Sequence, residues 1–156
     1  MHDSLTHINE QGQVSMVDVS NKEVLNRRSI AQGLFVAKEK TLDALLRADL
    51  PKGEGLAVAR VAGIQAAKQC SNLIPLCHPL PINCIDISFT RIASGELQIT
   101  ASVSVQGRTG VEMEALTAVS VAALTLWDMT KAIDDNLAIE KITLIEKVKS
   151  PINAGI

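Results

Sequence analysis

Two stretches of alternating residues, Cys84-Ile-Asp-Ile-Ser-Phe-Thr90 and Leu97-Gln-Ile-Thr-Ala-Ser-Val-Ser-Val-Gln106, decide the fold class of this chain. In both stretches every second residue is apolar, and Ser94-Gly95 lies between them. A period of two on either side of a short Ser-Gly turn predicts an antiparallel hairpin with one face in solvent. Other elements must therefore cover the apolar face of this hairpin.

An alanine-rich stretch before the hairpin predicts a helix that can provide this cover. Residues 56–69 read LAVARVAGIQAAKQ, in which Val58, Val61, Ala62 and Gln65 recur at helical spacing.

A second, longer helix is predicted over residues 111–133, after the hairpin. It is apolar on most of its circumference, and such a helix is buried on more than one side. We expect another subunit to supply the additional contact. Weaker patterns predict a strand over residues 30–37, a short helix over 41–46 and a last strand over 137–148.

The order of these elements is strand, helices, hairpin, long helix and strand, which is a βαββαβ pattern. It predicts an α+β fold of the ferredoxin-like type, in which helices cover an antiparallel sheet. We expect residues 1–156 to form a single domain. Residues 1–20 and 150–156 are expected to be arms, because they show no periodicity.

The composition argues against several classes of function. Apolar residues make up 47% of the 156 residues but aromatic residues only 2%, and the net charge is -2. Neither the charge nor the few aromatic rings favours nucleic-acid binding. The longest uncharged apolar stretch, residues 115–127, is shorter than the ~20 residues of a membrane span. Three cysteines without a CxxC pair, after a polar first segment, predict a cytoplasmic protein.

Two segments before the hairpin carry residues suited to binding or catalysis, and each also has a structural interpretation. Residues 51–55 (PKGEG) precede a helix and either bind an anion or form an ordinary turn. In residues 73–81 (LIPLCHPLP), His78 is either an acid–base or phosphate-contacting group or a structural histidine. Adjacent side chains of an extended segment point to opposite sides, which argues against a zinc site or a nucleophile–base pair at Cys77 and His78.

A third segment, residues 106–114 (QGRTGVEME), leads into the long helix and again suits an anion. Glu112 and Glu114 in its first turn either complement the helix dipole or turn toward a pocket. Further along, Asp128 and Lys131 are either an exposed ion pair or a functional pair. They follow an apolar run, so we expect desolvated surroundings and perturbed pKa values.

The length of the long helix constrains how these acidic residues combine. Glu112 and Asp128 are 16 positions apart, which is about 24 Å along a helix axis. They cannot share one pocket within a single straight helix. If both act on one substrate, neighbouring subunits must bring opposite ends of the helix together, which predicts a site at a subunit interface.

Together these segments resemble the cyclic pyranopterin monophosphate synthase family of molybdenum-cofactor biosynthesis. The matching stretches are LTHIN (5–9), MVDVS (16–20), KGEGLAVARVAGIQAAK (52–68), LIPLCHPL (73–80) and GRTGVEMEALTAVSVAALTLWDMTKA (107–132). They cover most of the chain in the right order, and LCHPL and TGVEMEALTA are too long to match by chance.

The resemblance implies a phosphorus–oxygen lyase, which converts (8S)-3′,8-cyclo-7,8-dihydroguanosine 5′-triphosphate into cyclic pyranopterin monophosphate and diphosphate. It implies a hexamer, assembled as a trimer of dimers, with sites at the dimer interface. Lys52, Lys131 and Asp128 match the catalytic residues of the family. Residues that match its substrate-binding positions, or are candidates for holding the triphosphate, are Leu76, Cys77, His78, Glu112, Met113, Glu114, Arg27, Arg108 and Lys147.

The chain departs from the family pattern at its C-terminal end. The family usually closes with a lysine followed by a glycine-rich tail, whereas residues 145–151 read IEKVKSP. Lys147 matches the lysine, but the missing glycines leave open whether a flexible tail encloses the phosphates. Glu54 stands where an aspartate is common.

No metal-ligand pattern is visible, so no cofactor is predicted, and a divalent metal accompanying the triphosphate stays open. The alternative function is a non-catalytic oligomeric module that binds a phosphorylated nucleotide-like ligand, because fold alone does not determine function. The combination of Lys52, Lys131 and Asp128 discriminates between the two, since binding alone would not need it.

Overall fold

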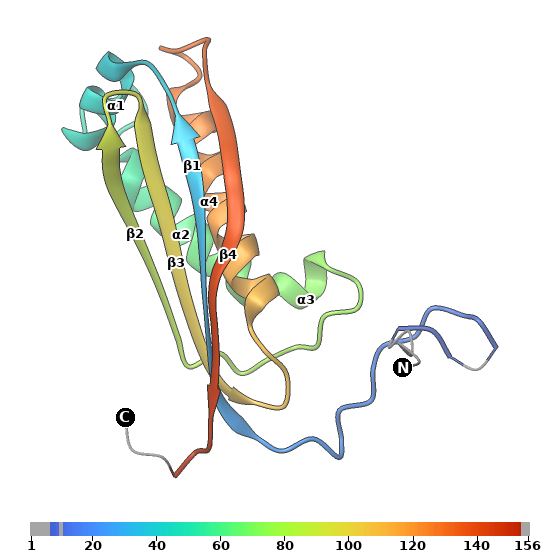
Figure 1. Ribbon diagram of the computed structural model, residues 1–156. Coiled ribbons are helices and arrows are strands. Elements are labelled where there is room, and N and C mark those ends of the chain that lie inside the picture. The colour runs from blue at the N-terminus through green and yellow to red at the C-terminus, as the bar shows by residue number, and fades with distance from the viewer. Residues whose placement is uncertain (1–6, 10, 154–156) are drawn as a thin grey trace.

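A four-stranded antiparallel sheet with helices on one face forms the body of the protein (Figure 1). The computed structural model describes residues 7–9 and 11–153. The strands, in the sheet order β2-β3-β1-β4, are β2 (Cys84–Ala93), β3 (Glu96–Gly107), β1 (Leu25–Val36) and β4 (Ala138–Ser150). The helices are α1 (Glu39–Leu46), α2 (Gly55–Lys68), α3 (Cys70–Leu73) and α4 (Glu112–Thr130). This arrangement confirms the predicted α+β ferredoxin-like fold.

The hairpin of β2 and β3 is formed as the alternation predicts. The two strands pair in antiparallel register, with Ser88 opposite Thr100. The buried apolar residues of β3 are Leu97, Ile99, Ala101, Val103 and Val105. The hairpin therefore turns its apolar side chains toward the helices. The turn itself requires a glycine, because a Cβ at Gly95 would lie only 2.8 Å from the carbonyl oxygen of Ala37.

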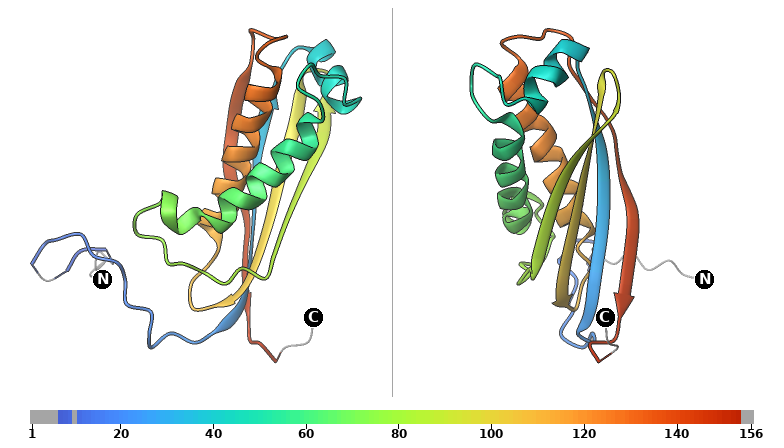
Figure 2. Two further views of the ribbon diagram at one scale, coloured as in Figure 1. Left: turned by 180° about the vertical axis from the view of Figure 1, so that it is seen from behind. Right: turned by 90° about the vertical axis from the view of Figure 1, so that its left-hand side faces the viewer.

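Helix α2 packs between α4 and β2 through small side chains (Figure 2). Its buried residues are Gly55, Ala59, Gly63, Ala66 and Ala67. A Cβ at Gly63 would lie 2.9 Å from the carbonyl oxygen of Ala118 and would collide with Ile87. The valines of the predicted helical stripe instead face outward, with Val58 45% and Val61 56% exposed. The spacing predicted the helix but not its buried face, because close packing against α4 and β2 requires the smallest side chains.

Helix α4 lies along the sheet and is largely buried within the single chain. Its buried residues are Glu114, Ala115, Ala118, Val119, Ala122, Ala123, Leu126, Met129 and Thr130. Leu124 and Trp127 remain exposed. The contact with another subunit, expected from the apolar circumference, stays a prediction.

Strand β1 begins earlier than its sequence pattern predicts. Its ladder with β3 extends to the pair Leu25 and Gly107, and its ladder with β4 extends to the pair Asn26 and Ser150. The polar stretch of β1 is therefore held by neighbouring strands, and Arg27 is placed in a regular strand.

The two ends of the chain leave the body in different ways. The described part of the N-terminal arm runs away from the sheet (Figure 1), and Ile8 forms an isolated bridge with Val14. At the other end, β4 continues to Ser150. Residues 1–6, 10 and 154–156 of the predicted arms lie outside the described residues. Within the part of the chain that the structure describes, no helix has the length and hydropathy to span a membrane.

Candidate active site

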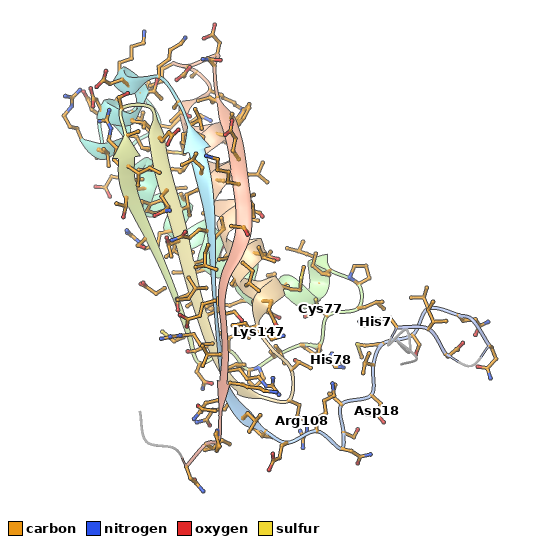
Figure 3. All side chains as sticks on the ribbon, in the orientation of Figure 1. His7, Asp18, Cys77, His78, Arg108 and Lys147 are labelled. Carbon is orange, nitrogen blue, oxygen red and sulfur yellow. The ribbon has the colours of Figure 1, made fainter. Side chains whose placement is uncertain are left out.

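The predicted site residues lie in two groups at opposite ends of α4. Lys52, Asp128 and Lys131 are at its C-terminal end and are called the lysine–aspartate cluster below. The other candidates surround its N-terminal end, where Figure 3 labels Cys77, His78, Arg108 and Lys147. Because α4 runs from Glu112 to Thr130, about 24 Å along its axis separates the groups. The single chain does not bring them together.

The lysine–aspartate cluster joins two ammonium groups to one carboxylate. Lys52 Nζ lies 2.9 Å from Asp128 Oδ2 and 2.9 Å from the backbone carbonyl oxygen of Asp128. Lys131 Nζ lies 2.8 Å from Asp128 Oδ1. Each carboxylate oxygen thus pairs with a different lysine, and the cluster carries one net positive charge.

The two ammonium groups strongly lower the pKa of Asp128. Its hydrogen bonds to Lys131 and then to Lys52 are the main causes, and they bring the pKa from 3.8 to about 2. The expected desolvation of this site is wrong for the single chain, because the Asp128 side chain is 56% exposed. Asp128 in the last turn of α4 and Lys131 directly after the helix lie at the surface, although the residues before them are apolar. Pairing, and not burial, therefore causes the shift.

A tight turn before α2 directs Lys52 to this carboxylate. Gly53 has a φ of 90°, which favours glycine, and its N–H donates to the carbonyl of Leu50 at 2.9 Å. A Cβ at Gly55 would lie 2.5 Å from Leu45 Cδ1. The PKGEG segment therefore shapes a close turn, from which Lys52 reaches across to α4.

At the other end of α4, the Cys-His connector and the entry to the helix enclose a small pocket of about 130 Å³. Its lining residues are Leu76, Cys77, His78, Leu80, Thr109, Gly110, Met113 and Glu114. The connector follows α3, whereas the other wall comes from the β3–α4 loop and the first turn of α4. The structure thus brings together two of the segments singled out in the sequence.

Burial dominates the chemistry of two groups in this pocket. Glu114 is 4% exposed, and burial raises the pKa of its carboxyl group. Burial also raises the pKa of the Cys77 thiol. A thiol with a raised pKa is a poor nucleophile, in line with the geometric argument against nucleophilic catalysis by Cys77.

His78 is held by the N-terminal arm. Its Nε2 lies 2.8 Å from the carbonyl oxygen of Val17. A carbonyl can only accept, so Nε2 carries the hydrogen and Nδ1 is the remaining ring nitrogen. The segment between this arm and β1 passes Arg108, whose Nε donates to the carbonyl oxygen of Lys22 at 3.1 Å. These two contacts with the chain before β1 could not be predicted from local patterns.

The basic residues of this end are held mainly by backbone oxygens. Arg27 Nε donates to the carbonyl of Gly107 at 2.9 Å, and its Nη2 donates to the carbonyl of Arg108 at 3.1 Å. Lys147 forms an ion pair with Glu112 in the first turn of α4. Within the described residues, neither Arg27 nor Arg108 is paired with a carboxylate.

Strand alternation distinguishes Arg27 from its neighbour Arg28. Arg27 stands opposite buried Val105 on the helix-covered face of the sheet, whereas Arg28 projects from the other face and pairs with Glu146 at 2.5 Å. Only Arg27 therefore joins the group around Arg108, and its match with the family arginine stays a prediction.

Sequence reasoning missed Asp134, a buried carboxylate close to the lysine–aspartate cluster in sequence. It accepts hydrogen bonds from Lys38 N at 2.8 Å, Thr41 Oγ1 at 2.7 Å and Asn136 N at 2.9 Å. Asp134 thus joins the start of α1 to the turn after α4. In sequence it lies in a polar loop, and no local signal reveals its partners.

Among the described residues, no three histidine, cysteine, aspartate or glutamate side chains converge as metal ligands do. The charged groups around both ends of α4 are lysines paired with carboxylates, and arginines bound to backbone carbonyl oxygens. They suit a polyanionic substrate and proton transfer.

Known proteins resemble this chain over most of its length. The family model described as "MoaC family" matches residues 16–150. The chain is 51% identical over 143 residues to the cyclic pyranopterin monophosphate synthase of Novosphingobium aromaticivorans, covering 92% of this chain and 90% of that protein. It is 52% identical over 147 residues to the synthase of Chloroflexus aurantiacus, covering 94% and 90%. It is 51% identical over 145 residues to the synthase of Listeria monocytogenes serotype 4a, covering 93% and 91%.

Proposed function

We propose that this chain, because it belongs to the MoaC family, acts as a cyclic pyranopterin monophosphate synthase. The enzyme is a lyase of molybdenum-cofactor biosynthesis. It converts (8S)-3′,8-cyclo-7,8-dihydroguanosine 5′-triphosphate into cyclic pyranopterin monophosphate and releases diphosphate. The matched residues, 16–150, include every candidate site residue.

The observation that carries the chemical assignment is the carboxylate of Asp128 shared by Lys52 and Lys131. With a pKa of about 2, Asp128 remains ionised near neutral pH and does not carry the transferred proton. It orients the two lysines instead. Proton transfers during ring opening and ring closure are assigned to Lys52 and Lys131, each of which can approach the substrate from its own side of the carboxylate.

The complete site lies between two copies of the chain in this proposal. The lysine–aspartate cluster of one copy faces the pocket of His78 and Glu114 in the other, because one α4 holds the two groups too far apart. Leu124 and Trp127, which precede Asp128 on α4, are exposed apolar residues that such a contact would cover. Covering them would also reduce the exposure of Asp128. A hexamer built from three such dimers is the proposed assembly.

The group around the N-terminal end of α4 binds the substrate. Leu76, Cys77, His78, Met113 and Glu114 receive the purine-derived part, because they line the pocket. The cationic residues Arg27, Arg108 and Lys147 hold the triphosphate.

Cyclisation of the phosphate then requires a substrate hydroxyl to attack the α-phosphorus. The new P–O bond forms as the bond to the β-phosphate breaks, the hydroxyl proton passes to a base, and diphosphate leaves. Cations around the phosphates favour this step by stabilising the departing charge. A divalent metal accompanying the triphosphate is compatible with this assignment but has no protein ligands in it.

The three cysteines, Cys70, Cys77 and Cys84, are free thiols, which supports the proposal that the enzyme works in the cytoplasm. The deciding test of the function is incubation of the purified protein with the cyclised GTP derivative. We expect equal amounts of the cyclic pyranopterin and diphosphate. Tight binding of the substrate without either product would favour the non-catalytic ligand-binding module.

A further inference from the structure

Lys149, which is not among the candidate site residues above, lies beside Arg27 in the sheet. The two residues stand opposite each other in the antiparallel pairing of β1 and β4. Directly opposite residues project from the same face, with Cβ atoms about 5 Å apart. Lys147, two residues earlier on β4, projects from this face as well. Lys149 therefore extends the row of basic residues on this face, which begins with Lys147, the ion-pair partner of Glu112.

The backbone of Lys149 is held by regular structure. The ladder of β1 and β4 continues one residue further, to Ser150 opposite Asn26. The side-chain amide of Asn26 also donates to the carbonyl oxygen of Pro151 at 3.2 Å. The end of β4 is thus paired with β1 on both sides of Lys149. The backbone that carries this lysine is therefore already ordered, and only its side chain has to be ordered when a ligand binds.

The positive charges at this end of the sheet are not balanced. Lys147 is neutralised by Glu112, but Arg27 and Arg108 donate to carbonyl oxygens that carry no formal charge. The exposed Lys149 has no ion-pair partner among the residues described. Three cations at this end of the sheet thus lack a carboxylate partner among the described residues, and an anion with several charges can balance them.

We propose that Lys149 is a further phosphate-binding residue, which together with Arg27 and Arg108 holds the polyphosphate chain of the substrate. The proposal rests on the proposed function for the identity of this anion. The site itself requires only an inorganic polyphosphate, which provides a test that does not depend on turnover. A strand-borne lysine takes the place of a flexible tail around the phosphates.

Calorimetric titration with inorganic tripolyphosphate tests the role of Lys149. We expect Lys149→Ala to weaken tripolyphosphate binding roughly five- to tenfold, and increasing salt to reduce the difference. Lys149→Arg should restore most of the affinity because it keeps the charge. Lys141→Ala is the matched control: it removes the same charge from an exposed position of β4, near the opposite end of the strand.

Kinetics separate this role from a structural one. With the cyclised GTP derivative, Lys149→Ala should raise KM and leave kcat close to that of the wild type. Equal tripolyphosphate affinity in the wild type and Lys149→Ala, or equal losses in Lys149→Ala and Lys141→Ala, would overturn the inference. Failure of the proposed function has a different signature, in which tripolyphosphate binding depends on Lys149 but no pyranopterin forms.

Discussion

Lys52 binds Asp128 across 76 positions of sequence, with its Nζ 2.9 Å from both the carboxylate Oδ2 and the backbone carbonyl oxygen. Two acceptors on one residue fix the lysine more firmly than a carboxylate alone. This contact joins the turn before α2 to the last turn of α4. Asp128 therefore anchors Lys52 and at the same time pairs with Lys131.

Lys131→Ala should reduce kcat by roughly 10²- to 10⁴-fold, the range expected when a general acid or base is removed. Substrate binding should remain largely intact, because the residues proposed to hold the phosphates lie at the other end of α4. Stopped assays for diphosphate and equilibrium binding measure the two effects separately. Lys40→Ala, an exposed lysine of α1, is the control for loss of charge. Turnover by Lys131→Ala at the wild-type rate would refute the catalytic role.

Two variants that are each inactive should regain activity when they are mixed, if the site lies between two copies of the chain. Glu112→Ala and Asp128→Ala remove residues from opposite ends of α4, so a mixed dimer contains one site with both residues intact. Random mixing should restore about a quarter of the sites, since half of the dimers are mixed and each has one intact site. Activity of the remixed chains provides the measurement. Verified mixed oligomers that stay inactive would contradict a shared site.

The carboxyl group of Asp128 should titrate near pH 2 and not near 3.8. Its folded pKa is lowered, so its ion pairs stabilise the protein above the unfolded pKa, and this contribution disappears as pH falls through about 2. Carboxyl-carbon NMR follows this titration directly. In Lys131→Ala the pKa should move back toward 3.8, because the main cause of the shift is gone. An unchanged pKa in that variant would show that another group controls Asp128.

Asp134→Asn should lower the free energy of unfolding by about 2–4 kcal/mol, since an amide cannot accept from three donors at a buried site. Burial by itself would raise the pKa of Asp134, but hydrogen bonds from Asn136, Thr41 and Lys38 outweigh it and leave the pKa below 3.8. The stabilisation is therefore complete at neutral pH and is lost as pH falls through the folded pKa.

Urea denaturation at pH 7 measures the effect of Asp134→Asn. The matched control is Asp135→Asn, because the side chain of Asp135 is 90% exposed and, among the described residues, forms an ion pair only with Lys38. An exposed pair of this kind is screened by solvent and contributes little to the free energy of unfolding. Equal midpoints for the two variants would refute the role of the buried carboxylate.

Some of the site was predictable because its residues are close in sequence. Residues 73–81 and 106–114 each carry a recognisable candidate pattern, and the length of α4 shows that Glu112 and Asp128 cannot meet within one chain. The predicted desolvation of Asp128 is wrong for the single chain. Its surroundings depend on how the last turn of α4 emerges from the packed layer, which the apolar run before it does not reveal.

Local periodicity by itself determined the β2–β3 hairpin, the existence of α2 and α4 and the order of the elements, because alternation and helical spacing directly reflect which side chains avoid water. Only the tertiary structure decided that α2 buries its small residues, that Arg27 and not Arg28 lies beside Arg108, and that Lys52 meets Asp128. Each of these depends on a neighbour distant in sequence: Ala118 beneath Gly63, the ladders on both sides of β1, and the end of α4. Contacts of this kind arise from the packing of whole elements, so no local pattern encodes them.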